Sequence, residues 1–113
     1  MEDTIFSKIL NGQIKTDFIY EDEYCVAFHD IAPQAPVHFL VIPKTPYIDI
    51  KEATKDSTLA GHLLRVCCDV ANSLGLDPEG YRIITNKGNS GGQTVKHLHF
   101  HVLGGRALTW PPG

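Results

Sequence analysis

Apolar residues between positions 59 and 74 recur at the spacing of a helix. After Asp56 they form one stripe, and Gly75 stands where a left-handed residue commonly ends a helix. We therefore expect one long helix that begins near Asp56 and ends before Gly75. Its apolar stripe consists of Leu59, Leu63, Val66, Cys67, Val70 and Leu74.

The N-terminal residues predict one short helix over positions 4–10. Asp3 can cap this helix, and Asn11 and Gly12 end its pattern. We expect one face of it to be apolar, formed by Ile5, Phe6 and Ile9.

Shorter apolar runs between turn residues predict strands. Residues 18–20 and 25–28 flank an acidic turn and suit a hairpin, and further strands are expected over 38–42, over 81–86 and from His97. Most of the links are too short for a crossover helix, which favours an antiparallel sheet of about five strands, although the long helix could cross between two of them. The predicted fold class is therefore α+β, and we expect a single domain over residues 1–113.

Charge and composition narrow the function classes. Ten basic and thirteen acidic residues give a formal net charge of −3, so a general electrostatic attraction to nucleic acid is not expected. No apolar run has membrane-spanning length, and the polar residues 1–4 lack the order of a signal peptide. We expect a cytoplasmic protein that binds neither nucleic acid nor membrane.

The three cysteines, Cys25, Cys67 and Cys68, contain no Cys-x-x-Cys pair. We expect small buried hydrophobic residues in a reducing compartment, without disulfides.

Three histidines alternate with apolar residues in the segment 97–101. In a strand, His97, His99 and His101 would share one face while Leu98 and Phe100 face the core. Imidazoles near their ordinary pKa of about 6.5 can act as nucleophile, acid and cation in one site. This combination suits phosphoryl chemistry.

Two other interpretations of these histidines stay open. Two of them could bind zinc, with His38 as a further ligand, but all three are too spread along a strand for one tetrahedral centre. They could also be ordinary hydrogen-bonded residues without chemistry. We expect no metal and no cofactor.

A glycine-rich loop, residues 87–94, immediately precedes the histidines. Its backbone can form a concave group of N–H donors that holds a phosphate. It is not a Walker-type P-loop, because no Gly-Lys-Ser or Gly-Lys-Thr follows the glycines. Glycine, asparagine and serine are also ordinary loop residues, so its place beside the histidines is what favours an anion site.

The run His97-Leu98-His99-Phe100-His101-Val102-Leu103 resembles the His-φ-His-φ-His-φ-φ signature of the histidine-triad superfamily. The chain is similar to the Hint branch of that superfamily, the histidine-triad nucleotide-binding proteins, over most of its length. The matching segments are residues 3–6, 27–31, 33–36, 38–44, 91–93 and 110–113.

This resemblance implies a homodimer whose two sheets join into one. It also implies binding of purine nucleoside monophosphates and hydrolysis of the P–N bond of adenosine or guanosine phosphoramidates, with acyl-adenylates as related substrates. His99 would be the nucleophile and would form a nucleotidyl-histidine intermediate. His101 would stabilise charge on the phosphate, while His97 and His38 would orient the array or relay protons.

The remaining site residues are also implied by the resemblance. Asp30 matches the position that binds the ribose hydroxyls, and Trp110 would reach the partner's site. The base pocket would be lined by Phe6, Ile9, Phe28, His29, Ile31 and Leu40, and the phosphate and leaving group would be held by Asn86, Gly92, Gln93, Thr94 and His101.

One departure from the family pattern is Thr94, where serine is usual. Its hydroxyl could still deliver a proton, but the added methyl group restricts χ1 and puts the leaving-group preference in doubt. Two further functions stay open: hydrolysis of dinucleoside polyphosphates, and nucleotide-dependent regulation with vestigial catalysis.

Overall fold

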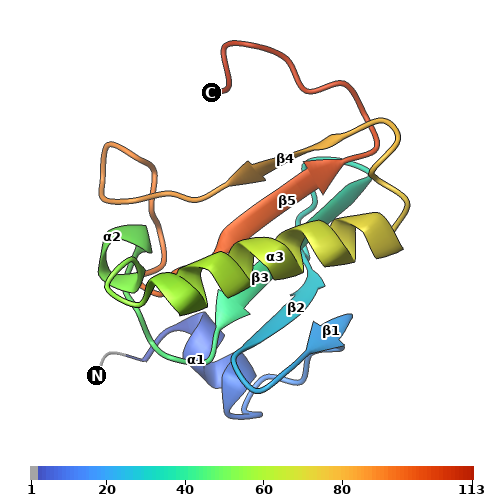
Figure 1. Ribbon diagram of the computed structural model, residues 1–113. Coiled ribbons are helices and arrows are strands. Elements are labelled where there is room, and N and C mark those ends of the chain that lie inside the picture. The colour runs from blue at the N-terminus through green and yellow to red at the C-terminus, as the bar shows by residue number, and fades with distance from the viewer. Residues whose placement is uncertain (1–2) are drawn as a thin grey trace.

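A five-stranded antiparallel sheet forms the centre of the computed structural model, which describes residues 3–113. The first two residues of the polar N-terminal segment discussed above lie outside the described residues. The strands follow the spatial order β1-β2-β3-β5-β4 (Figure 1). Their bounds are Tyr20–Glu21 for β1, Cys25–His29 for β2, Val37–Pro43 for β3, Tyr81–Ile84 for β4 and Phe100–Gly104 for β5.

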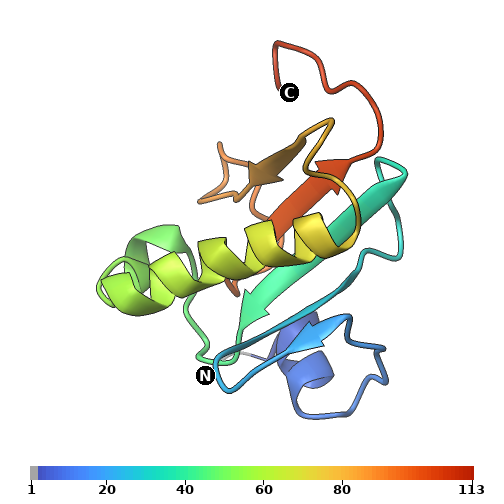
Figure 2. The ribbon, with the colours of Figure 1, turned by 45° about the vertical axis from the view of Figure 1, so that its right-hand side comes forward.

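Within residues 3–113, three helices accompany this sheet: α1 (Ile5–Leu10), α2 (Ile50–Ala53) and α3 (Ser57–Ser73). The predicted α+β class, the antiparallel sheet and the crossing long helix are confirmed, since α3 connects β3 to β4 while β5 lies between those strands (Figures 1 and 2). The sequence pattern missed α2, which is a single turn capped by Asp49. Within residues 3–113, no helix combines the length and hydrophobicity needed to cross a membrane.

Alternating side chains of the central strands supply two separate apolar cores. Cys25, Ala27, Phe39 and Val41 of the strands face α3. They pack against residues of that helix, which include Leu63, Val66 and Val70. Their chain neighbours on the opposite face pack under α1, and this second core consists of Phe6, Ile9, Val26, Phe28, Leu40 and Ile42. A period of two along each strand produces this division, because successive side chains point to opposite faces.

Local capping interactions set the helix ends. In α3 the Asp56 side chain accepts a hydrogen bond from the Leu59 N–H, and Gly75 adopts a φ of +81° just beyond the last turn, as expected. For α1 the predicted cap Asp3 is wrong: Thr4 is the cap, and its hydroxyl accepts from the Ser7 N–H at 3.1 Å. Ser7 Oγ in turn accepts from the Thr4 N–H, which gives a reciprocal capping box.

Other expectations need correction at the surface. Ile5 is 48% exposed, because Phe6 and Ile9 are the residues of α1 that are buried against the sheet. Cys25 and Cys67 are buried, but Cys68 is exposed, because it is one helical position beyond the buried stripe of α3.

Candidate active site

The three histidines of segment 97–101 lie on the α1 side of the sheet. Only His101 belongs to β5, which begins at Phe100, so the predicted strand from His97 starts later than expected. The predicted alternation nevertheless holds: Leu98 and Phe100 belong to the core under α3, while the rings of His97 and His99 pack against Phe6 at centroid distances of 6.0 and 4.8 Å.

The His99 ring is fixed by its own chain segment. Its Nδ1 lies 2.8 Å from the His97 carbonyl oxygen, so Nδ1–H donates to that oxygen and Nε2 carries the lone pair. The His99 carbonyl oxygen accepts a hydrogen bond from the Thr85 hydroxyl on the segment after β4, at 2.9 Å. These contacts hold a neutral imidazole with one nitrogen available for bonding to an electrophile.

His101 and His38 form a directed hydrogen-bond chain. The Gln34 N–H donates to His38 Nδ1 at 3.1 Å, which places the His38 proton on Nε2. His38 Nε2 lies 2.9 Å from His101 Nδ1 and donates to it, so the proton of neutral His101 resides on its own Nε2. Two bonds from the Arg106 guanidinium to the Gln34 carbonyl oxygen, at 2.9 and 3.1 Å, secure the start of this chain.

Asp30 and His97 are two further polar side chains of the site. Asp30 Oδ2 lies 3.5 Å from His38 Nε2, and Asp30 Oδ1 accepts from the Ala32 N–H at 2.8 Å. His97 Nε2 donates to the Pro43 carbonyl oxygen at 2.9 Å, so this buried ring is anchored to the end of β3. The contacts of His97 therefore suit a residue that positions the segment carrying His99.

Burial lowers the pKa of all four imidazoles, those of His38, His97, His99 and His101. For His101, burial and the neighbouring His99 and His38 bring the pKa down to about 4, although the Asp30 carboxylate opposes this. At His99, burial outweighs the hydrogen bond to His97 and the Asp30 charge. The expectation of imidazoles near their ordinary pKa is therefore wrong for this site, where the rings are neutral at pH 7.

The residues expected in the base pocket divide into two groups. Phe6, Ile9, Phe28 and Leu40 are brought together in the α1-side core, next to the His99 ring. His29 and Ile31 are exposed, Ile31 to 96%. Trp110, which the resemblance assigns to the partner's site, is 81% exposed. The C-terminal segment that carries Trp110 extends past β4 (Figure 1), where Arg82 donates to the Leu108 and Thr109 carbonyl oxygens.

The glycine-rich loop is braced by its own polar groups. Asn86 Nδ2 donates to the Gly91 carbonyl oxygen, and Gln93 Nε2 donates to the carbonyl oxygens of Ile48 and Val95. The N–H groups of Gly88, Gly92 and Gln93 also find acceptors inside the loop. Because these three donors are already engaged, a phosphate would be held by other N–H groups of the loop, such as those of Asn89 and Ser90, or by His101 Nε2–H.

Close packing explains one glycine of this loop. A Cβ on Gly91 would overlap the Lys87 carbonyl oxygen, so a side chain cannot be accommodated without moving the backbone. Thr94, the last residue of the loop, is exposed.

Residues 11–108 match the HIT domain. The chain belongs to the HIT domain family. It is 57% identical to an uncharacterized HIT-like protein of Synechococcus elongatus, over 99% of this chain and 98% of that protein.

Solved structures share this HIT fold. A HIT family hydrolase from Legionella pneumophila has a TM-score of 0.93 and 43% identity, covering 98% of this chain and 100% of that one. A histidine triad nucleotide-binding protein from Candida albicans has a TM-score of 0.83 and 29% identity, covering 96% of this chain and 83% of that one. The fold of this HIT domain thus matches that of HIT proteins in crystal structures.

The hydrogen-bonding groups of the site that the sequence pattern did not identify are mostly backbone atoms. They are the carbonyl oxygens of His97 and Pro43, the N–H of Gln34, and the Thr85 hydroxyl that fixes the His99 carbonyl. Backbone groups carry no residue-type signal, so only the fold reveals them.

For a metal, the atoms of Asp30, His38 and His101 lie within 4.8 Å of one another. Both His38 nitrogens are occupied by the hydrogen-bond chain, which a metal would have to break.

Proposed function

We propose that this HIT domain hydrolyses purine nucleoside phosphoramidates to AMP or GMP and an amine, through a nucleotidyl intermediate on His99. The observation that carries the proposal is the bond from His99 Nδ1 to the His97 carbonyl oxygen, which leaves a lone pair on Nε2 of a neutral, buried ring. The HIT hydrolase and nucleotide-binding relatives support the same class of reaction.

In the first step, His99 Nε2 attacks the α-phosphorus opposite the departing amine. A new N–P bond forms as the substrate P–N bond breaks, and the amine leaves with a proton. Water then attacks the same phosphorus, the His99–phosphorus bond breaks, and the nucleotide is released. The single displacement is thereby divided into two with lower barriers.

His101 stabilises the negative charge that grows on the non-bridging oxygens. The chain from Gln34 through His38 presents the Nε2–H of His101 as a donor, and a well-placed donor of this kind is worth about 3–4 kcal/mol of barrier. His38 acts as a positioning residue because it fixes the His101 tautomer. His97 holds the segment through Pro43.

The nucleoside would be held beside these rings. Asp30 would accept hydrogen bonds from the ribose hydroxyls, and the base would lie against Phe6, Ile9, Phe28 and Leu40, with His29 and Ile31 at the exposed rim. Asn86 and Gln93 brace the loop that, with Gly92, would border the phosphate and leaving group.

The leaving amine needs a proton, and Thr94 is the proposed local donor. General acid assistance of this kind contributes about 10²–10⁴ in rate. Thr94 is exposed, so it can meet a substrate that enters from solvent. We further propose a homodimer in which Trp110, exposed in one chain, covers the partner's site.

A turnover comparison tests the proposed substrate. Adenosine phosphoramidate and a diadenosine polyphosphate are supplied at equal concentration, with His99→Gly as the inactive control. We expect faster hydrolysis of the phosphoramidate. A clear preference for the dinucleotide would assign the other hydrolase function, and nucleotide binding without turnover of either would favour a regulator.

A further inference from the structure

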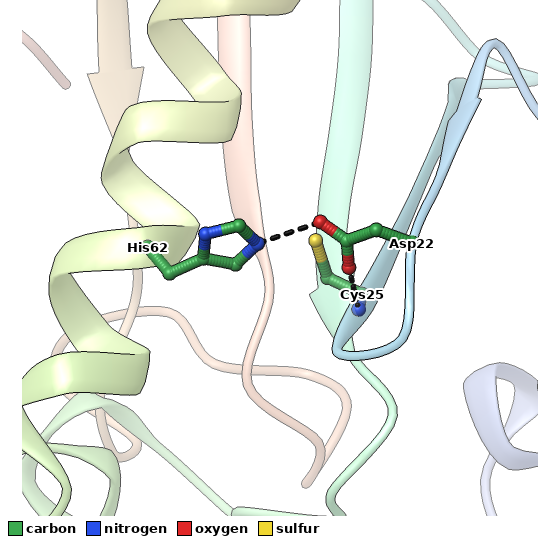
Figure 3. Close-up of side chains that lie close together, drawn as sticks. All are labelled: Asp22, Cys25 and His62. Atoms are coloured by element: carbon green, nitrogen blue, oxygen red, sulfur yellow. Dashed lines mark hydrogen bonds and ion pairs between the residues drawn. The ribbon is translucent and has the colours of Figure 1, made fainter.

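A second cluster of side chains that can bind a metal ion lies on the sheet face opposite the histidine site. It joins Asp22, in the turn between β1 and β2, to Cys25 at the start of β2 and His62 on α3 (Figure 3). One carboxylate oxygen, one sulfur and one imidazole nitrogen lie within 4.8 Å of one another. The proposed hydrolysis uses none of these residues.

The Asp22 carboxylate is rigidly oriented. Its Oδ1 accepts from the N–H groups of Tyr24 and Cys25 at 2.7 and 2.9 Å. Its Oδ2 accepts from the Tyr20 hydroxyl at 2.8 Å and from His62 Nε2 at 2.6 Å. Two backbone donors and one phenol therefore fix the carboxylate, while the neighbours Cys25 and His62 are the two side-chain types that bind zinc most readily.

We propose that Asp22, Cys25 and His62 form a zinc site that ties the β1–β2 turn to α3. The set of one thiolate, one imidazole and one carboxylate matches the ligands of tetrahedral Zn²⁺, with bonds of about 2.0–2.3 Å. Ligand atoms in such a centre lie about 3.3–3.8 Å apart. The contact between Asp22 Oδ2 and His62 Nε2 must widen slightly when the ion binds. The three ligand atoms lie within 4.8 Å of one another, which leaves room for the ion between them.

Charge and protons balance on binding. Asp22 supplies a carboxylate that already accepts hydrogen bonds from Tyr20, His62 and two backbone N–H groups. Zn²⁺ displaces the Cys25 thiol proton to solvent, and the proton on His62 Nε2 moves to Nδ1 so that Nε2 can coordinate the ion. Tyr20 and the two backbone N–H groups remain on the carboxylate and orient it.

Solvent reaches the proposed site through the partly exposed side chains of Asp22 and His62. A cavity of about 310 Å³ adjoins His62, and it is lined by Tyr24, Thr45, Asp56, Thr58 and Leu59 as well. His62 and Asp22 are partly exposed, with 33% and 23% of their side-chain surfaces accessible, whereas Cys25 is buried. An ion can therefore reach Asp22 and His62 from solvent, and water can supply a further ligand on that side.

Cobalt provides the decisive probe, because a thiolate bound to Co²⁺ gives a near-ultraviolet sulfur-to-metal charge-transfer band. The reduced full chain is titrated with Co²⁺, and Zn²⁺ is then added to displace it. We expect a charge-transfer band and tetrahedral ligand-field bands at one equivalent of metal, both abolished by Zn²⁺. The other possible ligand group, Asp30, His38 and His101 of the histidine site, contains no sulfur and cannot produce the charge-transfer band.

Matched variants locate the thiolate. Cys25→Ser should abolish the charge-transfer band, and His62→Gln, which replaces a partly exposed residue, should weaken Co²⁺ binding by more than about tenfold. Cys68→Ser and Cys67→Ala should leave the band unchanged. Absence of the band at saturating Co²⁺, its persistence in folded Cys25→Ser, or its loss in Cys68→Ser would each overturn the zinc site.

If Cys25→Ser fails to fold, the His62→Gln titration still decides. Unchanged Co²⁺ affinity in this variant would overturn the proposal. Thermal unfolding gives an independent readout: Zn²⁺ should raise the midpoint of the wild type and leave that of His62→Gln unchanged.

Discussion

Acidification protonates the neutral, buried imidazoles of the site. Of these, His101 has the most strongly lowered pKa and therefore the largest effect on stability. Its pKa is about 6.5 in an unfolded chain and about 4 in the folded one. The folded state therefore binds fewer protons than the unfolded state below about pH 6.5, so stability is present above that pH and is lost as the pH falls toward about 4. At pH 5 this single group removes roughly 2 kcal/mol of unfolding free energy relative to pH 8.

Urea unfolding of wild type and His101→Asn at about pH 8 and about pH 5 measures this quantity. Asparagine keeps an oxygen that can accept from His38 Nε2 but does not titrate. We expect the wild type to lose roughly 2 kcal/mol more stability than the variant between the two pH values. His29→Asn, which removes an exposed histidine, is the matched control and should keep the wild-type loss. Equal losses in wild type and His101→Asn would refute the reasoning.

Three further predictions concern the core, the nucleophile and the C-terminal segment. Leu63→Ala should lower the free energy of unfolding by about 2–5 kcal/mol, measured by chemical denaturation, because Leu63 is fully buried between α3 and the sheet. Leu64→Ala, at a position 44% exposed, should lower it much less. The acid limb of kcat/KM for a phosphoramidate should lie below pH 6.5, because burial lowers the pKa of His99 and its lone pair persists there; a limb at or above pH 6.5 would contradict this. Truncation after Leu108 should change substrate preference by removing Trp110, and an unchanged preference in kcat/KM comparisons would argue against its proposed role.

Strong periodicity made part of this structure predictable. The stripe of α3 spans several turns, so its buried face and both of its ends could be identified from the sequence. Similarly, the alternation around His99 placed the imidazoles opposite Leu98 and Phe100, as observed. The position of β3 was also anticipated, because its apolar run lies between prolines.

Other features depend on three-dimensional contacts that no local pattern contains. The helix α2 is one turn long, which is too short for a periodic signal. The lowered pKa of His101 comes from burial under the assembled sheet and from His38, 63 residues away in the chain. The contact of His62 with Asp22 likewise joins a helix to a turn 40 residues away.

The most direct test of the proposed function is the search for a covalent bond at His99. The enzyme is mixed with a slowly reacting nucleoside phosphoramidate, quenched in acid and analysed by peptide mass spectrometry, with His99→Gly as the control. We predict a nucleotidyl adduct on His99 that forms and decays within turnover and is absent from the control. Turnover without an adduct, or an adduct on His97 or His101 instead, would contradict nucleophilic catalysis by His99.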